Sequence, residues 1–174
     1  VTCFGGSTGS FTVTPSGGTG AHTVAGTLTG LAVGTHTYSV TDANGCVFNG
    51  SVTITAPATA VSATTAQTNV SCFGGSNGSF TVTPSGGTGA HTVTGTFTGL
   101  ASGTHTYSVT DANGCVFNGS VTLTQPATAV SATTAQTNVS CFGGSNGSFT
   151  VTPSGGTGAH TVVGTFTIGG AWSR

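Results

Sequence analysis

The five cysteines of this 174-residue chain are the residues whose type most directly suggests a chemical role. Zinc sites use closely spaced pairs such as Cys-x-x-Cys, and a catalytic cysteine needs a fixed base and an orienting group; the sequence shows neither. In each of the repeats described below, one cysteine stands near the end of the first expected strand. The other stands on the return strand of a hairpin further along, and both have inward parity. We therefore expect disulfides within the repeats, with zinc as the alternative if both thiols of a pair are free. The expected pairs are Cys3–Cys46 and Cys72–Cys115, which leaves Cys141 over because its equivalent partner would lie beyond residue 174.

Histidine and aspartate are the other residue types that could bind a metal or move a proton. Each of the first two repeats carries two histidines at strand starts, but no third zinc ligand accompanies them, so we expect them to fill the end of the core. The Asp-x-Asn-Gly motif resembles the start of a calcium loop, but the later carboxylates of such a loop are missing. Two aspartates at equivalent positions of different repeats cannot form a carboxylate pair for acid–base catalysis. The sequence thus predicts no catalytic residue, no metal site and no cofactor. The residues concerned are His22, His36, His91, His105, Asp42 and Asp111.

Asparagines in Asn-x-Ser sequons are candidate sites of glycosylation. The threonine-rich outward faces could also carry O-linked sugar, and the alternative is bare threonine ladders that pair across strands. Sugar would help solubility, because exposed sheet edges here lack the charged residues that usually protect them. The sequons are Asn49, Asn69, Asn77, Asn118, Asn138 and Asn146.

The composition excludes several partners. Only 2% of the residues are charged and the formal net charge is −1, so no cluster of Lys and Arg could attract nucleic acid or an anionic membrane. No apolar run approaches the length of about 18 residues that a membrane-spanning helix requires, so we expect no such helix. The start at Val1 shows no signal peptide, and we interpret the chain as a mature or excised segment.

Residues 103–124 predict the β-hairpin around which the chain is organised. His105, Tyr107 and Val109 share one side of the first strand, and apolar residues alternate in the same way along the return strand. Between them, Asp111-Ala-Asn-Gly114 predicts the turn, because Asp and Asn bond to their own backbone and Gly accepts positive φ. The same hairpin occurs one repeat earlier, at 34–55.

The repetition extends over almost the whole chain. Residues 3–57 and 72–126 differ at six positions, and 58–98 and 127–167 differ only at Thr94 against Val163. Prolines mark the junctions, so we expect a repeat without its first strand at 1–57, a complete repeat at 58–126 and a truncated one at 127–174. Many short strands with glycine turns predict an all-β fold of antiparallel sandwiches. A core in a 69-residue repeat is marginal, so a covalent staple is expected.

The motifs of the complete repeat resemble the SprB-type repeat of very large cell-surface adhesins in Bacteroidetes, including the gliding-motility adhesin. They are Ser-Cys-Phe-Gly-Gly-Ser-Asn-Gly-Ser (71–79), Ser-Gly-Gly-Thr (85–88), Gly-Leu-Ala-Ser-Gly-Thr (99–104) and Val-Thr-Asp-Ala-Asn-Gly-Cys (109–115), closed by Thr-Gln-Pro126. The resemblance implies tandem immunoglobulin-like sandwiches, export to the cell surface, often by type IX secretion, and a structural or adhesive role.

We therefore expect an extracellular structural repeat that forms a stalk or fibril, and not an enzyme. The alternative is a module that itself binds carbohydrate, although a lectin site should show exposed aromatic residues and here the aromatics mostly have inward parity. The expected partners are neighbouring repeats or copies of the chain in a linear array, completed by the continuing chain or by strand addition from another copy, with bound or covalent glycan as a further possibility.

Overall fold

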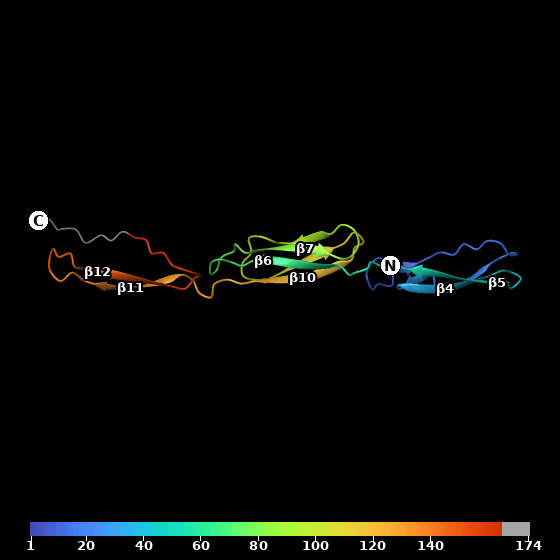
Figure 1. Ribbon diagram of the computed structural model, residues 1–174, viewed down its shortest axis with the longest axis horizontal. Coiled ribbons are helices and arrows are strands. Elements are labelled where there is room, and N and C mark those ends of the chain that lie inside the picture. The colour runs from blue at the N-terminus through green and yellow to red at the C-terminus, as the bar shows by residue number, and fades with distance from the viewer. Residues whose placement is uncertain (165–174) are drawn as a thin grey trace. The chain divides into compact units, whose positions relative to one another are not determined.

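The structure is a computed structural model, and it describes residues 1–164; the divergent tail at 168–174 lies outside the described residues. The described part contains strands and turns and no helix, which confirms the all-β fold class (Figure 1). Among these residues, no helix is long and apolar enough to cross a membrane. The strands are β1 (Gly9–Ser10), β2 (Thr23–Ala25), β3 (Thr29–Leu31), β4 (Gly34–Thr41), β5 (Val47–Ile54), β6 (Ser62–Thr68), β7 (Ser79–Ser85), β8 (Thr92–Gly95), β9 (Gly103–Thr110), β10 (Val116–Leu123), β11 (Ser131–Thr137) and β12 (Ser148–Ser154).

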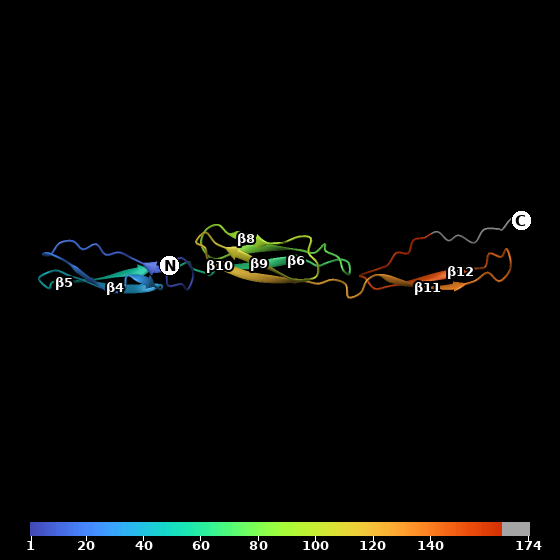
Figure 2. The same ribbon diagram turned by 180° about the vertical axis from the view of Figure 1, so that it is seen from behind.

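The strands form small sheets whose order repeats along the sequence. One three-stranded sheet has the order β2-β4-β5 and the other has the equivalent order β10-β9-β8, which Figure 2 shows from behind. Two-stranded sheets pair β1 with β3, β6 with β7 and β11 with β12. The neighbouring strands β2–β4, β4–β5, β8–β9 and β11–β12 are antiparallel, as expected for a chain of hairpins and short connections.

The predicted hairpins are present at both places. In the earlier copy, β4 and β5 pair in register from Gly34–Ile54 to Thr41–Val47. In the later copy, the inward parity read from the sequence is confirmed, because Tyr107, Val109, Val121 and Leu123 are all buried. Period-two alternation places alternate side chains on opposite faces of a strand, and only one face of this hairpin is covered.

The same side chains are buried to different degrees in different repeats. Phe80 on β7 is 3% exposed, whereas its equivalent Phe149 on β12 is 46% exposed. Val61, just before β6, is 9% exposed, whereas Val130, just before β11, is 69% exposed. Because the sequences around each pair are the same, the difference lies in what covers them and not in the strands themselves.

The chain divides into two compact units, and the predicted repeat boundaries at residues 57 and 126 stay a prediction. The first unit contains Val1–Ala66, Thr81–Thr96 and Thr106–Ser120, and the second contains Gln67–Phe80, Phe97–His105 and the described residues from Val121 onward.

Candidate functional site

The turn that joins β9 to β10 is organised by the carboxylate of Asp111. Its Oδ1 accepts the backbone N–H groups of Asn113 and Cys115, each at 2.9 Å. Its Oδ2 accepts the backbone N–H of Thr88, also at 2.9 Å, and so fastens a second loop to the turn. Burial, at 5% exposure, acts to raise the pKa of Asp111, but these backbone N–H groups and the nearby His91 outweigh it, so the pKa lies below its usual value.

Asp42 organises the equivalent turn between β4 and β5 with the same set of bonds. Its Oδ1 accepts the backbone N–H groups of Cys46 and Asn44 at 2.9 Å, and its Oδ2 accepts that of Thr19 at 3.0 Å. The N–H of Cys46 makes the largest contribution to a lowered pKa of Asp42. The predicted turn is therefore confirmed in both hairpins, and the sequence did not reveal that each aspartate also holds a distant loop.

A disulfide joins Cys3 to Cys115, with their Cα atoms 5.6 Å apart. The bond links the Cys-Phe-Gly-Gly loop at the start of the chain to the turn after β9, 112 residues further on. Next to it, the side-chain Nδ2–H of Asn113 donates to the backbone oxygen of Thr2 at 3.4 Å. The cystine is thus a link between a loop of one sequence repeat and a turn of the next.

The predicted pairs Cys3–Cys46 and Cys72–Cys115 are wrong. The backbone N–H of Val70, two residues before Cys72, bonds to the oxygen of Thr124, which follows the end of β10. Cys115 stands before the start of that strand. Eight residues of extended chain span about 26 Å, whereas the Cα atoms of a disulfide lie about 4.4–6.8 Å apart. The inward parity expected of these cysteines also fails at Cys46 and Cys72, which are exposed free thiols, as is Cys141.

The histidines hold loops through hydrogen bonds to backbone oxygens. The Nε2–H of His91 donates to the backbone oxygen of Gly86 at 2.8 Å, and that of His105 donates to Ala101 at 2.9 Å. The earlier repeat has the same bonds from His22 and His36. In the part of the chain that the structure describes, no three residues among His, Cys, Asp and Glu come together to hold a metal ion.

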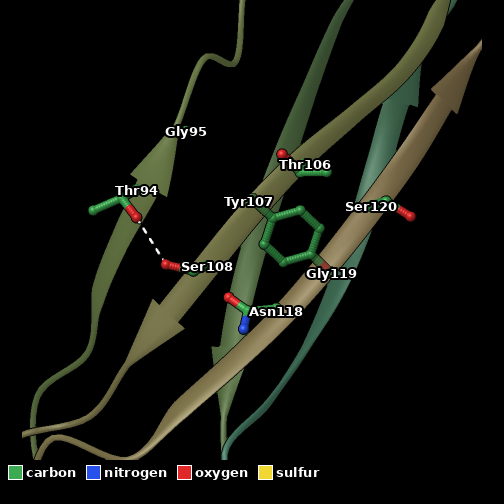
Figure 3. Close-up of a pocket in the computed structure, with 8 residues that line it drawn as sticks. All are labelled: Thr94, Gly95, Thr106, Tyr107, Ser108, Asn118, Gly119 and Ser120. Carbon is green, nitrogen blue, oxygen red and sulfur yellow. Dashed lines mark hydrogen bonds between the residues drawn. The ribbon is translucent and has the colours of Figure 1, made fainter.

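A shallow groove of about 670 Å³ lies at the β8-β9-β10 sheet, with Tyr107 among the residues that line it (Figure 3). The Tyr107 ring lies against Gly119, where an added Cβ would overlap with the ring. The only aromatic ring at this groove is therefore held against a glycine, and Tyr107 is 7% exposed. A glycine inside a strand indicates such a close approach, and this signal was present in the sequence but not used. The lining residues are Thr94, Gly95, Thr106, Tyr107, Ser108, Asn118, Gly119 and Ser120.

The groove offers hydroxyl and amide groups and no side chain that is charged at neutral pH. The hydroxyls of Thr94 and Ser108 lie 2.9 Å apart in a hydrogen bond across β8 and β9. A groove of about 650 Å³ around Tyr38 lies at the equivalent place on the β2-β4-β5 sheet, but Ala25 stands there in the position of Thr94, so the hydroxyl pair is not repeated. Such a surface can exchange hydrogen bonds with another polar molecule, but it contains no carboxylate or imidazole pair for acid–base catalysis.

All six sequon asparagines are exposed, but their side chains differ in how they are held. The amide of Asn77 bonds to both the N–H and the hydroxyl of Ser71, and that of Asn146 bonds to Ser140 in the same way. Asn69 accepts the backbone N–H of Thr124 at 3.0 Å. Asn49 and Asn118 lie at the grooves instead, in the sequon Asn-Gly-Ser. Within residues 1–164, the side chains of these two asparagines make no hydrogen bond.

Comparisons with known proteins identify one family. The family model described as the SprB repeat matches residues 1–23, 64–114 and 133–161, which together make up more than half of the chain. Neither the curated proteins nor the solved structures contain a match to this chain.

Proposed function

This chain belongs to the SprB repeat family, and from that premise we propose that it is a structural segment of a stalk or fibril that supports adhesion. Repeats of this family occur in large cell-surface proteins of Bacteroidetes. Export by type IX secretion and any part in gliding belong to this proposal as well. We propose no catalytic role for the chain.

The observation that carries the proposal is the duplication of one hairpin together with the backbone bonds that its aspartate accepts. Asp42 and Asp111 hold the same backbone groups, and Tyr38 and Tyr107 cover equivalent glycines. A unique active site would need a feature that occurs once, whereas here the hairpins 34–55 and 103–124 differ only at Ile54 against Leu123. Repetition of one rigid unit suits an extended mechanical element whose parts contact mainly their neighbours.

The proposed assembly is a linear array of repeats, extended by the continuing chain or by further copies. The eight-residue strands of each hairpin, at roughly 3.3 Å per residue, set a spacing on the order of 30–45 Å per repeat once turns are added. Because the surface is nearly uncharged, we propose that attached glycan keeps the array soluble. Asn49 and Asn118 are the proposed attachment sites. An intact mass above that of the bare polypeptide, lost on Asn118→Gln and Asn49→Gln substitution, tests this modification.

Antibody labelling of the native cells tests the proposed location. An antibody against the β9–β10 hairpin should label intact cells as strongly as permeabilised ones, and brief surface proteolysis should remove the signal together with adhesion. Labelling that requires permeabilisation would contradict the proposal.

A carbohydrate-binding module is the second candidate, because the groove presents the hydroxyls of Thr94 and Ser108 and the amide of Asn118. Sugar-binding sites usually add an exposed aromatic face, and the ring of Tyr107 is buried. A glycan array probed with the whole chain decides between the candidates. Binding that is lost in a Thr94→Ala, Ser108→Ala variant and kept in a Thr122→Ala variant, which changes a threonine outside the groove, would favour the carbohydrate role.

A further inference from the structure

The two halves of the Cys3–Cys115 link occur again in this chain with free thiols. The loop half is the segment Cys-Phe-Gly-Gly that begins at Cys3, and Cys72 begins the equivalent segment of the next repeat. Cys115 represents the turn half, Asp-Ala-Asn-Gly-Cys, and Cys46 is its equivalent in the preceding repeat. Both free thiols are exposed.

The unlinked halves already have the backbone geometry of the linked ones. In the loops, the N–H of Gly75 bonds to the oxygen of Cys72 at 3.0 Å, as the N–H of Gly6 does to Cys3 at 3.1 Å. In the turns, the N–H of Cys46 bonds to Asp42 at the same 2.9 Å that separates Cys115 from Asp111. Formation of a second link therefore requires no refolding of either half.

Cys141 heads a third copy of the loop, in which the N–H of Gly144 bonds to the oxygen of Cys141 at 3.0 Å. The N–H of Val70 holds the Cys72 loop to Thr124, and the amino group of Val1 holds the Cys3 loop to Thr55 at 2.6 Å. No equivalent bond from Val139 is present in residues 1–164, and Val139 is 45% exposed. The Cys72 loop therefore shares with the Cys3 loop both its internal bond and the bond to the end of a return strand.

We propose that Cys72 of one copy of this chain forms a disulfide with Cys46 of a second copy, and that this link joins copies head to tail. The loop and the turn are different surfaces, so the contact does not close on itself and each copy keeps one free half for the next. This inference deepens the proposed array and rests on it.

The distance in sequence between Cys72 and β11 means that the proposed disulfide also brings β11 to the second copy. In the existing link, Cys3 stands as far ahead of the start of β6 as Cys72 stands ahead of the start of β11. The strands β6 and β11 have the same sequence. A copy that engages Cys46 through Cys72 therefore also brings β11 to the sheet that β4 and β5 form. Phe48 of that sheet is 62% exposed and Val130 is 69% exposed, whereas their equivalents Phe117 and Val61 are more covered.

The bond forms by thiol–disulfide exchange with a small disulfide such as oxidised glutathione. The thiolate of Cys72 attacks the small disulfide and releases one thiol, and the thiolate of Cys46 then attacks the mixed disulfide and releases the second. Two electrons pass from the two cysteines to the small disulfide, and the two protons pass to the two thiols that leave.

Three forms of the whole chain, all carrying Cys141→Ser, test the link. One keeps Cys46 and Cys72, one carries Cys46→Ser and one carries Cys72→Ser. Each is incubated with a mixture of reduced and oxidised glutathione and resolved on a non-reducing gel. The chain with Cys46 and Cys72 intact should form a ladder of covalent multimers, whereas Cys46→Ser alone and Cys72→Ser alone should stay monomeric. Mixing the two single variants should give a covalent dimer and nothing larger, because only one link can form.

Chymotryptic mapping identifies the linked residues, since the chain lacks lysine and its only arginine is the last residue. The peptides that carry Cys46 and Cys115 have the same sequence, 39–48 and 108–117, so the Cys46→Ser variant is needed to assign them. Absence of covalent multimers, multimers from either single variant, or a Cys72–Cys72 peptide would each overturn the inference. The proposed function has a separate test: it fails if the protein is not on the cell surface. The location of the protein does not depend on the Cys46–Cys72 disulfide.

Discussion

Tyr38 on β4 is paired directly with Gly50 on β5, and its ring occupies the space above that glycine. The later hairpin has the same arrangement of Tyr107 and Gly119. In each hairpin the tyrosine ring therefore occupies the space that a side chain at the glycine would fill, and both residues line the polar groove.

The first prediction concerns this contact. Gly119→Ala should lower the free energy of unfolding by about 1–3 kcal/mol, because the new methyl group must displace the Tyr107 ring. Urea denaturation measures the loss. Gly164→Ala is the matched control, because an added Cβ there meets no atom within 4 Å. If Gly119→Ala is as stable as the control, the ring does not depend on the glycine.

Two phenylalanines with the same local sequence should respond differently to truncation. Phe80→Ala should cost about 3–5 kcal/mol, because the Phe80 side chain is almost fully buried. Phe149→Ala should cost less than about 1 kcal/mol, because nearly half of its side chain is exposed. Both substitutions are compared by urea denaturation in a Cys46→Ser background, which keeps the chain monomeric. Equal losses would mean that β12 is covered as β7 is.

The cystine should stabilise the part of the chain that it closes. Cys115→Ser should lower the free energy of unfolding by about 2–5 kcal/mol, because the bond to Cys3 closes a long loop in the unfolded chain. Cys72→Ser should leave it unchanged, since Cys72 is an exposed free thiol. The two variants are compared by thermal unfolding without reductant. A loss at Cys72 as large as that at Cys115 would restore the pairing expected from the sequence.

Acid should weaken the fold through two carboxylates. The pKa values of Asp42 and Asp111 are lowered in the folded chain, so each ionised group contributes stability that is fully present above its unfolded pKa, near 3.8. That contribution is lost as the pH falls through the folded pKa. The melting temperature should therefore fall below about pH 4. Replacing both residues by asparagine should flatten the profile, since no other side-chain carboxylate is present. A profile that keeps its slope in the double variant would assign the acid sensitivity elsewhere.

The sequence predicted the fold class and the hairpins because period-two alternation decides which face each residue occupies. Tyr107, Val109, Val121 and Leu123 were placed correctly for this reason. The disulfides were predicted wrongly because parity shows which face of a strand a residue occupies but not its position along the strand. Cys72 and Cys115 lie near opposite ends of β10.

Contacts made beyond one repeat also escaped prediction. The pairing of Cys3 with Cys115 depends on how one repeat meets the next, and no local pattern contains that information. Phe80 and Phe149 show the same limit, since identical neighbours in sequence do not give them identical neighbours in space.

Electron cryomicroscopy of the native protein, isolated without reductant, tests the central claim that these repeats form a structural array. The account predicts a linear series of β-sandwiches, one per 69-residue repeat, at a spacing on the order of 30–45 Å. Density for the Cys3–Cys115 type of link should appear between successive sandwiches. A single compact globule, or a continuous β-solenoid without separate sandwiches, would contradict the account.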